Sequence, residues 1–274
     1  MPAPSESRPP ATVREAENPP GDGRQSGVIH NIGYRHYDGP RLGRSYATRS
    51  LFAHSLRGAY GLGRSVRSKV LPMTLLGFMC FPAGIIVAVT VVTGADKLPL
   101  EYTRYAVYLQ AVITIFLAAQ APQLVSKDLR FATVPLYFSR PIERVDYVTA
   151  KFAAMTGALF ILTATPLLIL YAGALLAKLD FGTQTAGFGK GLLAALVLSV
   201  LYAALGLLIA ALTPRRGFGV AAIIALFTVS YGAVGTIQGI AWEEGNTGVV
   251  GWAGLFSPIT LVDGFQSWWL GATP

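Results

Sequence analysis

The residues of this sequence that could do chemistry are few, and they lie outside its apolar parts. The three histidines, His30, His36 and His54, all precede the first apolar stretch. Five stretches between Lys69 and Glu243 contain no Asp, Glu, His, Lys or Arg. An enzyme or ion-coupled carrier inside a membrane needs such groups there, because buried charges are costly and are kept for function. A phosphate-binding G-x-x-x-x-G-K-[ST] loop is absent as well. The sequence therefore predicts no catalytic, cofactor-binding or metal-binding residue, and an enzyme is the weakest alternative.

Charged residues that could contact another protein are concentrated in the segment 126–151. Apolar residues recur there at helical spacing among charged ones. Pro135 restricts the length of a helix in this segment, so we expect one short helix. Pro141 suits the first turn of the next helix. The acidic residues Glu143 and Asp146 also fit there, because the positive end of the helix dipole stabilises negative charge. The pattern predicts a short surface helix joined rigidly to the apolar stretch that follows. A packed connecting loop fits the same pattern equally well.

The elements that must position these residues are membrane-spanning helices. Each uncharged stretch has 22 to 26 residues between its flanking charges. A helix needs about 20 residues to cross the ~30 Å hydrocarbon core. With 53% hydrophobic and only 13% charged residues, the chain has about half the charge of a soluble domain. We expect an all-α polytopic membrane protein with five transmembrane helices, near 71–93, 105–125, 152–177, 191–213 and 218–240.

Two segments of different composition precede the first span. Residues 1–44 are rich in proline and in charges of both signs, so we expect a disordered or irregular tail. In residues 45–70, apolar side chains recur at roughly helical spacing opposite basic ones. This pattern is typical of an amphipathic helix on a membrane surface, here interrupted near Gly61 and Gly63. A solvated basic tail is the alternative.

The segment 242–270 follows the fifth span and contains all four tryptophans of the chain. Four glycines and Pro258 interrupt its uncharged run, and these residues weaken a helix of spanning length. Clustered aromatic residues are typical of the boundary between water and lipid. We expect short re-entrant helices on the external side, with Pro274 external as well.

The distribution of basic residues predicts the orientation in the membrane. If the N-terminus is cytoplasmic, 18 of the 22 Lys and Arg lie in cytoplasmic segments and 4 in external ones. The positive-inside rule therefore places the N-terminus and the 126–151 loop in the cytoplasm. It places the 94–104 and 178–190 loops outside the cell. We therefore expect a multi-pass protein of the cell (plasma) membrane.

Uncharged polar residues within the spans are the candidates for lining a transport pathway. Such residues would suit an amphipathic or apolar cargo, and packing between helices is the alternative role. The candidates are Gln110, Gln120, Thr163, Tyr231 and Gln238.

The 126–151 segment resembles the first intracellular loop of type-2 ABC transporter (ABC-2) permeases, in particular the actinobacterial-type exporter permeases. In that loop a leucine-rich part precedes Ser-Arg-Pro, which is followed by an arginine, a tyrosine and a lysine. The matching residues here are Leu136, Ser139, Arg140, Pro141, Ile142, Arg144, Tyr147 and Lys151. Segments 45–70 and 242–270 resemble that family's connecting helix and extracellular re-entrant hairpin.

The resemblance implies a permease subunit that moves substrate outward and has no ATPase site of its own. ATP and magnesium would bind to separate ABC ATPase subunits, and a second permease copy would complete a homodimer or related heterodimer. The sixth span of the family has no clear counterpart before Pro274, so we expect either that the chain is truncated or that residues 245–262 serve as a poor span. A non-transporting membrane scaffold is the alternative function, and no nucleic-acid partner is expected. The residues implied to couple the loop to the ATPase are Lys127, Asp128, Arg130, Pro135, Arg140, Pro141, Glu143 and Arg144.

Overall fold

The computed structural model of this chain describes residue 39 and residues 42–138, 142–213 and 215–270. The chain divides into two units, Met1–Arg41 and Leu42–Pro274, and the helices described below all belong to the second. Within the described residues every regular element is a helix, which confirms the all-α expectation. The tail predicted over residues 1–44 lies mostly outside the described residues.

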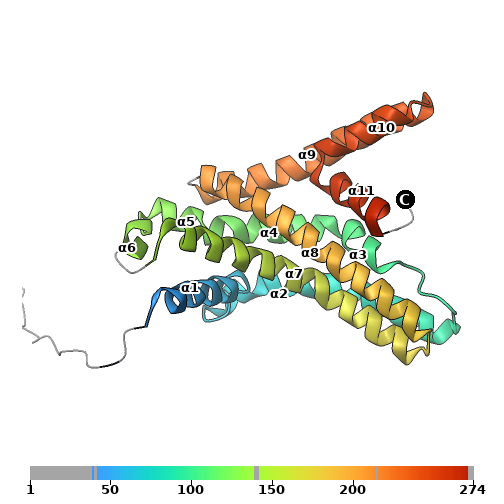
Figure 1. Cartoon of the computed structure of the whole chain (residues 1–274), viewed down its shortest axis with the longest axis horizontal. Coiled ribbons are helices and arrows are strands. Elements are labelled where there is room, and N and C mark those ends of the chain that lie inside the picture. Colours follow the sequence, from blue (N-terminus) through green and yellow to red (C-terminus); the bar gives the residue numbers. More distant parts are fainter. Residues whose placement is uncertain (1–38, 40–41, 139–141, 214, 271–274) are drawn as a thin grey trace, which may run out of the picture. The chain divides into compact units, whose positions relative to one another are not determined.

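Eleven α-helices and one 3-10 helix are present among the described residues (Figure 1). They are α1 (Arg44–Ala59), α2 (Val66–Thr93), α3 (Tyr102–Tyr108), α4 (Gln110–Leu124), α5 (Ser126–Arg130), α6 (Val134–Phe138), α7 (Arg144–Leu176), α8 (Phe181–Leu212), α9 (Arg216–Glu243), α10 (Thr247–Ala253), η1 (Gly254–Phe256) and α11 (Pro258–Leu270).

Four of these helices, α2, α7, α8 and α9, are long and apolar enough to cross a membrane. The chain is therefore a helical membrane protein. Helices α7 and α8 contain 33 and 32 residues, a length of about 50 Å at 1.5 Å per residue. That length exceeds the ~30 Å hydrocarbon core, so their polar ends extend beyond it.

The segment expected to be one straight span near 105–125 is bent. Helix α3 meets the α4–α5 segment at an angle of 61°, so the described chain has four spans, or five if the bent pair counts as one. The break lies at Leu109, whose φ of −101° and ψ of 19° depart from helical values. Buried hydrogen bonds fix α3 on its own side of the break. The Tyr102 hydroxyl donates to Gln184 of α8, and the Tyr105 hydroxyl donates to the Met79 carbonyl of α2.

The expected amphipathic helix over 45–70 is divided between two elements. Helix α1 ends at Ala59, and Val66 already starts α2, which continues into the first apolar stretch. Gly61 lies between them at a φ of +67°, and a Cβ there would lie 2.4 Å from the Ser68 carbonyl oxygen. Helix α1 packs against α7, with the Tyr60 hydroxyl donating to the Ala158 carbonyl at 2.7 Å. Its location on a membrane surface stays a prediction.

Helix α7 lies at the centre of the helix packing, against α1, α2 and α8. Glycines allow the closest approaches between neighbouring helices. A Cβ at Gly206 of α8 would lie 2.4 Å from the Leu117 side chain of α4, and one at Gly173 of α7 would lie 2.2 Å from Val87 of α2. Such small residues are typical of interfaces between membrane helices.

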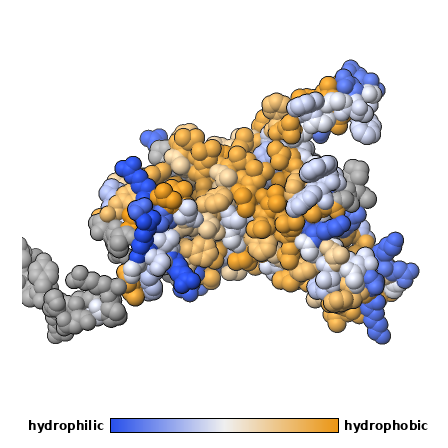
Figure 2. Space-filling model, viewed as in Figure 1, coloured by the Kyte–Doolittle hydropathy of each residue, from blue (hydrophilic) through white to orange (hydrophobic). Residues whose placement is uncertain are grey.

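The outer helices α2 and α9 keep most of their apolar surface exposed. Only 22% and 17% of their most apolar stretches are buried, compared with 50% for α7. Figure 2 shows hydrophobic residues across the middle of the visible face and hydrophilic residues towards its ends. This distribution is the one that a lipid environment or a second apolar helix surface requires.

The residues after α9 form short helices, as the glycine and proline content predicted. Helix α11 folds back against α3, α8 and α9, with its Ile259 and Val262 buried (Figure 1). Arg104 of α3 forms a salt bridge with Asp263, and Lys190 of α8 donates a 2.9 Å hydrogen bond to the Leu270 carbonyl. Their external location stays a prediction.

Candidate functional site

The candidate contact segment forms two short helices, α5 and α6, connected at Ala132, which has a φ of +48°. Helix α5 is anchored at its start, because the buried Ser126 hydroxyl donates to the Ala210 carbonyl of α8 at 2.8 Å. Helix α7 then begins at Arg144, with Glu143 as its N-cap. The short helix predicted beside Pro135 is therefore present, and it precedes the long helix as the sequence indicated.

A buried ion pair joins α5 to α7. The Lys151 ammonium lies 2.9 Å from a carboxylate oxygen of Asp128, and the Tyr147 hydroxyl donates to the same oxygen at 2.9 Å. The Lys151 and Asp128 side chains are only 7% and 17% exposed. Tyr147 and Lys151 are four residues apart, so both project from one face of α7 towards the carboxylate.

This cluster holds α5 in one position relative to α7. A buried charge without its partner is strongly destabilising, so neither Asp128 nor Lys151 can swing away separately at low cost. The Lys151 ammonium also lies 5.5 Å from the centre of the Tyr147 ring, a cation–π distance. These contacts therefore join α5 to the first turns of α7.

A second set of charges joins α1 to the same end of α7. Arg44 donates two hydrogen bonds to Asp146, at 2.6 and 3.0 Å, and pairs with Glu143 as well. Glu143 and Asp146 also form a capping box at the start of α7. The hydrogen bond to Asp146 raises the pKa of the Arg44 guanidinium above its usual value, and the guanidinium stays charged.

Sequence reasoning missed Arg44, which it assigned to the irregular tail. Arg44 is 99 and 102 residues from its two acidic partners, so spacing along the chain offers no signal for this contact. Lys151 was treated as the residue that bounds a span and as part of a motif. The structure places it inside α7, 6% exposed, as the buried partner of Asp128.

The structure divides the eight predicted coupling residues into groups. Asp128 turns inward to Lys151, so it is not available to a docking partner, and Lys127 is half-buried. Arg140 and Pro141 lie outside the described residues. The exposed members are Arg130, Pro135, Glu143 and Arg144.

Exposed apolar side chains lie among these charges. Phe131 and Leu136 are 66% and 67% exposed. Figure 1 shows α5 and α6 at one end of the bundle, near the start of α1. Exposed basic and apolar groups therefore lie together on the segment 126–138, and we refer to its two helices, α5 and α6, as the loop helices.

Two of the predicted pathway residues line one cleft. Gln110 of α4 and Tyr231 of α9 face a space of about 270 Å³, together with Thr114 and Thr228. The residues that line it are all uncharged, and Phe227 and Ile259 are among them. The side-chain oxygen of Gln110 has no hydrogen-bond partner among the described residues. The cleft therefore suits an apolar molecule with a few hydrogen-bonding groups.

The other three predicted pathway residues lie elsewhere. Gln120 is buried within α4 at 3% exposure, and the Thr163 hydroxyl donates to the Leu159 carbonyl of its own helix. The Gln238 amide donates to the Val250 carbonyl of α10 at 2.9 Å. None of the three lines the cleft, and of their contacts only the one from Gln238 to α10 joins two helices, the alternative role.

In the described part of the chain, no three His, Cys, Asp or Glu side chains form a group that could hold a metal ion. Comparison with protein-family models, with curated proteins and with solved structures finds no match to this chain. The resemblance to ABC-2 permeases therefore rests on the sequence of segments 45–70, 126–151 and 242–270 alone.

Proposed function

We propose that this chain is the permease subunit of an ATP-driven exporter, and that its loop helices receive the movement of a separate ATPase subunit. The observation that carries the proposal is the buried contact of Asp128 with Tyr147 and Lys151. A loop that only connects two spans needs no buried ion pair. A loop that must transmit a displacement to α7 needs such a fixed joint.

The charges around Arg44 extend this joint to α1. Because Arg44 pairs with Glu143 and Asp146, α1 and the first turn of α7 are held together beside the loop helices. A push on α5 would therefore move α1 and α7 as one body, in the manner of rigid-element switching transitions. The ATPase itself would bind ATP and magnesium and sit in the cytoplasm, on the side expected for the N-terminus.

Exposed side chains on and beside the loop helices fit this docking role. Arg130 at the end of α5 and Arg144 at the start of α7 supply positive charge, and Phe131 and Leu136 supply apolar area for a pocket of the partner. The outer faces of α2 and α9 would contact lipid or a second copy of the permease in the cell membrane. The uncharged cleft between α4 and α9 would hold an apolar or amphipathic cargo.

Affinity purification from the native membrane tests the proposal. The tagged wild-type chain should recover a protein that hydrolyses ATP, measured as phosphate release from the eluate. Arg130→Glu should reduce this recovery, because losing one partner of a charge pair that is buried in an interface costs about 2–5 kcal/mol of binding. Arg215→Glu is the matched control, since Arg215 is exposed in another expected cytoplasmic turn and lies outside the loop helices.

One result would contradict the role of the loop helices, and another would overturn the exporter assignment. Recovery of ATPase activity that is equal for wild type, Arg130→Glu and Arg144→Glu would reduce the loop helices to a connector. Recovery of a cytoplasmic protein without ATPase activity, lost on the same substitutions, would favour the membrane scaffold instead.

A further inference from the structure

Basic side chains from three segments gather at the end of the bundle where α2 and α9 begin. Lys127 of α5 is half-buried there, and Arg64 in the turn before α2 and Arg216 of α9 are exposed. Burial lowers the pKa of the Lys127 ammonium, and repulsion from the nearby charges of Arg64 and Arg216 adds to this effect. Lys127 is therefore the group that two arginines from separate segments approach.

Contacts between the helix ends hold Lys127 beside the start of α9. The buried Ser126 hydroxyl donates to the Ala210 carbonyl near the end of α8. A Cβ at Gly219 of α9 would lie 3.1 Å from the Pro122 side chain of α4. Helix α5 itself contacts both α8 and α9 (Figure 1). The ends of α4 and α8 and the start of α9 therefore meet where α5 begins.

Arg64 belongs to the turn that joins α1 to α2. A nitrogen of its guanidinium lies over the end of α1, since a Cβ at Gly58 would lie 3.7 Å from it. In the same turn, the ring of Tyr60 packs 5.6 Å from the ring of Phe116 in α4, measured between their centres. The turn is thereby fixed against α4, the helix that leads to Lys127.

The carboxylates at this end of the bundle are already engaged by other residues. The acidic residues that the structure describes in the segments 42–69, 126–151 and 213–217 are Asp128, Glu143 and Asp146. Lys151 pairs with the first of these, and Arg44 pairs with the other two. Among the described residues, no carboxylate forms a salt bridge with Lys127, Arg64 or Arg216.

Three positive charges without a paired carboxylate repel one another, and the half-burial of Lys127 makes this repulsion more costly. The starts of α2 and α9 add to the positive potential, because neither helix has an acidic residue in its first turn or a hydrogen bond from a capping side chain. The positive ends of both helix dipoles therefore remain available to an anion. An anion at Lys127 would remove the repulsion, so this cluster indicates an anion site.

The cluster also lies at the border of the apolar spans. Arg216 directly precedes the uncharged run 217–242 of α9. Apolar side chains at the same helix ends are exposed: Val66, Leu212 and Phe218 have exposed fractions of 75%, 74% and 66%. Lipid phosphates lie at such a border, and basic clusters beside spanning helices bind anionic headgroups. A lipid phosphate therefore fits this site better than the acidic side chain of a soluble partner.

We propose that the phosphate of an anionic lipid binds at Lys127, with Arg64 and Arg216 as the further positive groups. The acyl chains of the lipid lie along the exposed apolar side of α9, from Phe218 onwards. A zwitterionic lipid with the same chains binds less tightly, because its ammonium group meets the same positive charges. This inference does not depend on the exporter proposal.

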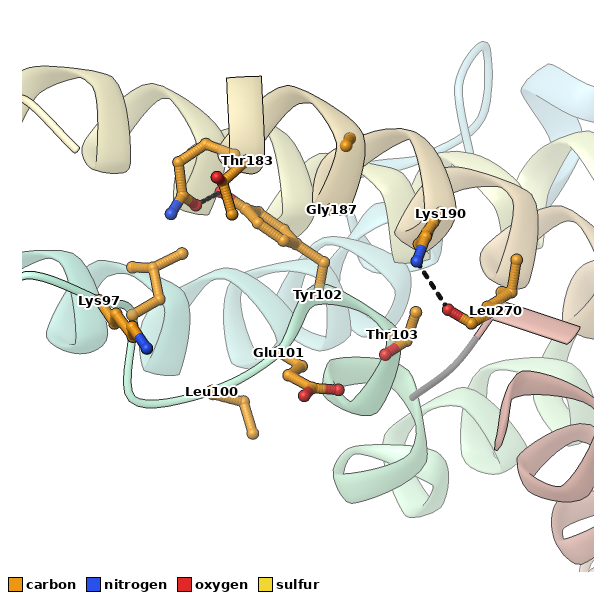
Figure 3. Close-up of a pocket in the computed structure, with 12 residues that line it drawn as sticks. Lys97, Leu100, Glu101, Tyr102, Thr103, Thr183, Gly187, Lys190 and Leu270 are labelled. Carbon is orange, nitrogen blue, oxygen red and sulfur yellow. Dashed lines mark hydrogen bonds between the residues drawn. The ribbon is translucent and has the colours of Figure 1, made fainter. Parts of the chain in front are cut away.

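The basic residues towards the opposite end of α8 provide a comparison. Lys97 and Lys190 line a cavity of about 440 Å³, but the Tyr102 side chain lies between them (Figure 3). The Lys190 ammonium donates instead to the Leu270 carbonyl at 2.9 Å. The two lysines share no common point, so Lys97→Gln is a matched control for the loss of one positive charge.

Lipid titration of the purified full chain in detergent tests the site. Phosphatidylglycerol is the anionic probe, phosphatidylcholine with the same chains is the zwitterionic comparison, and native mass spectrometry measures the affinity for the first bound lipid. Lys127→Gln, Arg64→Gln and Arg216→Gln should each weaken phosphatidylglycerol binding about fivefold, the contribution of one basic residue near a lipid phosphate. Phosphatidylcholine binding should stay as it is in all three variants. Lys97→Gln and Lys127→Arg should bind phosphatidylglycerol as the wild type does.

Glycerol 3-phosphate separates a lipid from a soluble phosphate ester. It should compete with phosphatidylglycerol only at concentrations about tenfold higher or more, because it lacks the acyl CH₂ groups that contribute to lipid binding. Competition at equal concentration would assign the cluster to a soluble phosphate and overturn the lipid. Equal phosphatidylglycerol affinity in the wild type and all three glutamine variants would overturn the site altogether.

Two further measurements separate lipid binding from partner docking and from misfolding. If Lys127→Gln lowers the recovery of ATPase activity from native membranes but leaves phosphatidylglycerol affinity unchanged, the cluster contacts a protein and the lipid assignment is wrong. Arg64 and Arg216 are exposed and form no salt bridge among the described residues, so their glutamine variants should keep the wild-type melting temperature. Weakened binding in these two variants at an unaltered melting temperature supports the site even if Lys127→Gln is unstable.

Discussion

Replacing Lys151 by methionine should destabilise the protein more than replacing both members of its ion pair. At the observed 2.9 Å separation and an effective dielectric constant of about 20, the two charges attract by about 332/(20 × 2.9), or ~6 kcal/mol. The desolvation of two buried ions offsets most of this attraction, so the intact pair contributes little net stability. When Lys151 is replaced, the attraction between the two charges is lost, but the desolvation cost of the Asp128 carboxylate remains because that group stays buried.

We therefore expect Lys151→Met to lower the free energy of unfolding by about 3 kcal/mol, the lower end of the range for breaking a buried pair, since Asp128 is 17% exposed. Asp128→Asn alone should cost a similar amount. The double variant should cost about 1 kcal/mol in total, because it leaves no unpaired charge. Tyr147→Phe removes only one hydrogen bond and should cost about 1 kcal/mol.

The free energy of unfolding of these four variants and of the wild type can be measured by titration with sodium dodecyl sulfate in mixed micelles, with circular dichroism as the signal. Lys178→Met is the control, since Lys178 forms no ion pair among the described residues. The decisive quantity is the coupling energy of the double-mutant cycle between positions 128 and 151. A coupling energy below about 0.5 kcal/mol, the limit for additive sites, would refute the fixed joint between α5 and α7.

Two further predictions concern helix packing and orientation in the membrane. Gly191→Ala should lower the unfolding free energy by about 1–3 kcal/mol, because the new Cβ would lie 2.7 Å from Tyr102. Gly189→Ala, with nothing within 4 Å of its new Cβ, should leave stability equal or higher, and equal losses in both variants would contradict the packing argument. In a chain whose native cysteine is replaced by alanine, Lys97→Cys should react with a membrane-impermeant maleimide in intact cells, and Arg130→Cys only after the cells are opened. The reverse labelling pattern would invert the topology and place the loop helices outside the cell.

The sequence alone determined that this protein is helical and membrane-embedded. The requirement for about 20 consecutive apolar residues is a one-dimensional property, so charge-free stretches predict spans without knowledge of their neighbours. The short helices after α9 were predicted for a similarly local reason, since glycines and Pro258 shorten helices wherever they occur. The segment proposed as the docking surface was also identified from the sequence, because charge, proline and apolar spacing mark a surface segment.

Only the tertiary structure decided which of these residues face inward. Asp128 and Arg130 look alike in the sequence, but α5 packs with Asp128 towards Lys151 and leaves Arg130 exposed. The bend at Leu109 was likewise hidden, because apolar residues continue through it and tertiary contacts, among them those of α3 with α2 and α8, hold the two arms apart. Arg44 finds its acidic partners about 100 residues away. Composition and spacing encode how long each helix is, whereas the partners of its charged side chains depend on which faces of the helices pack together.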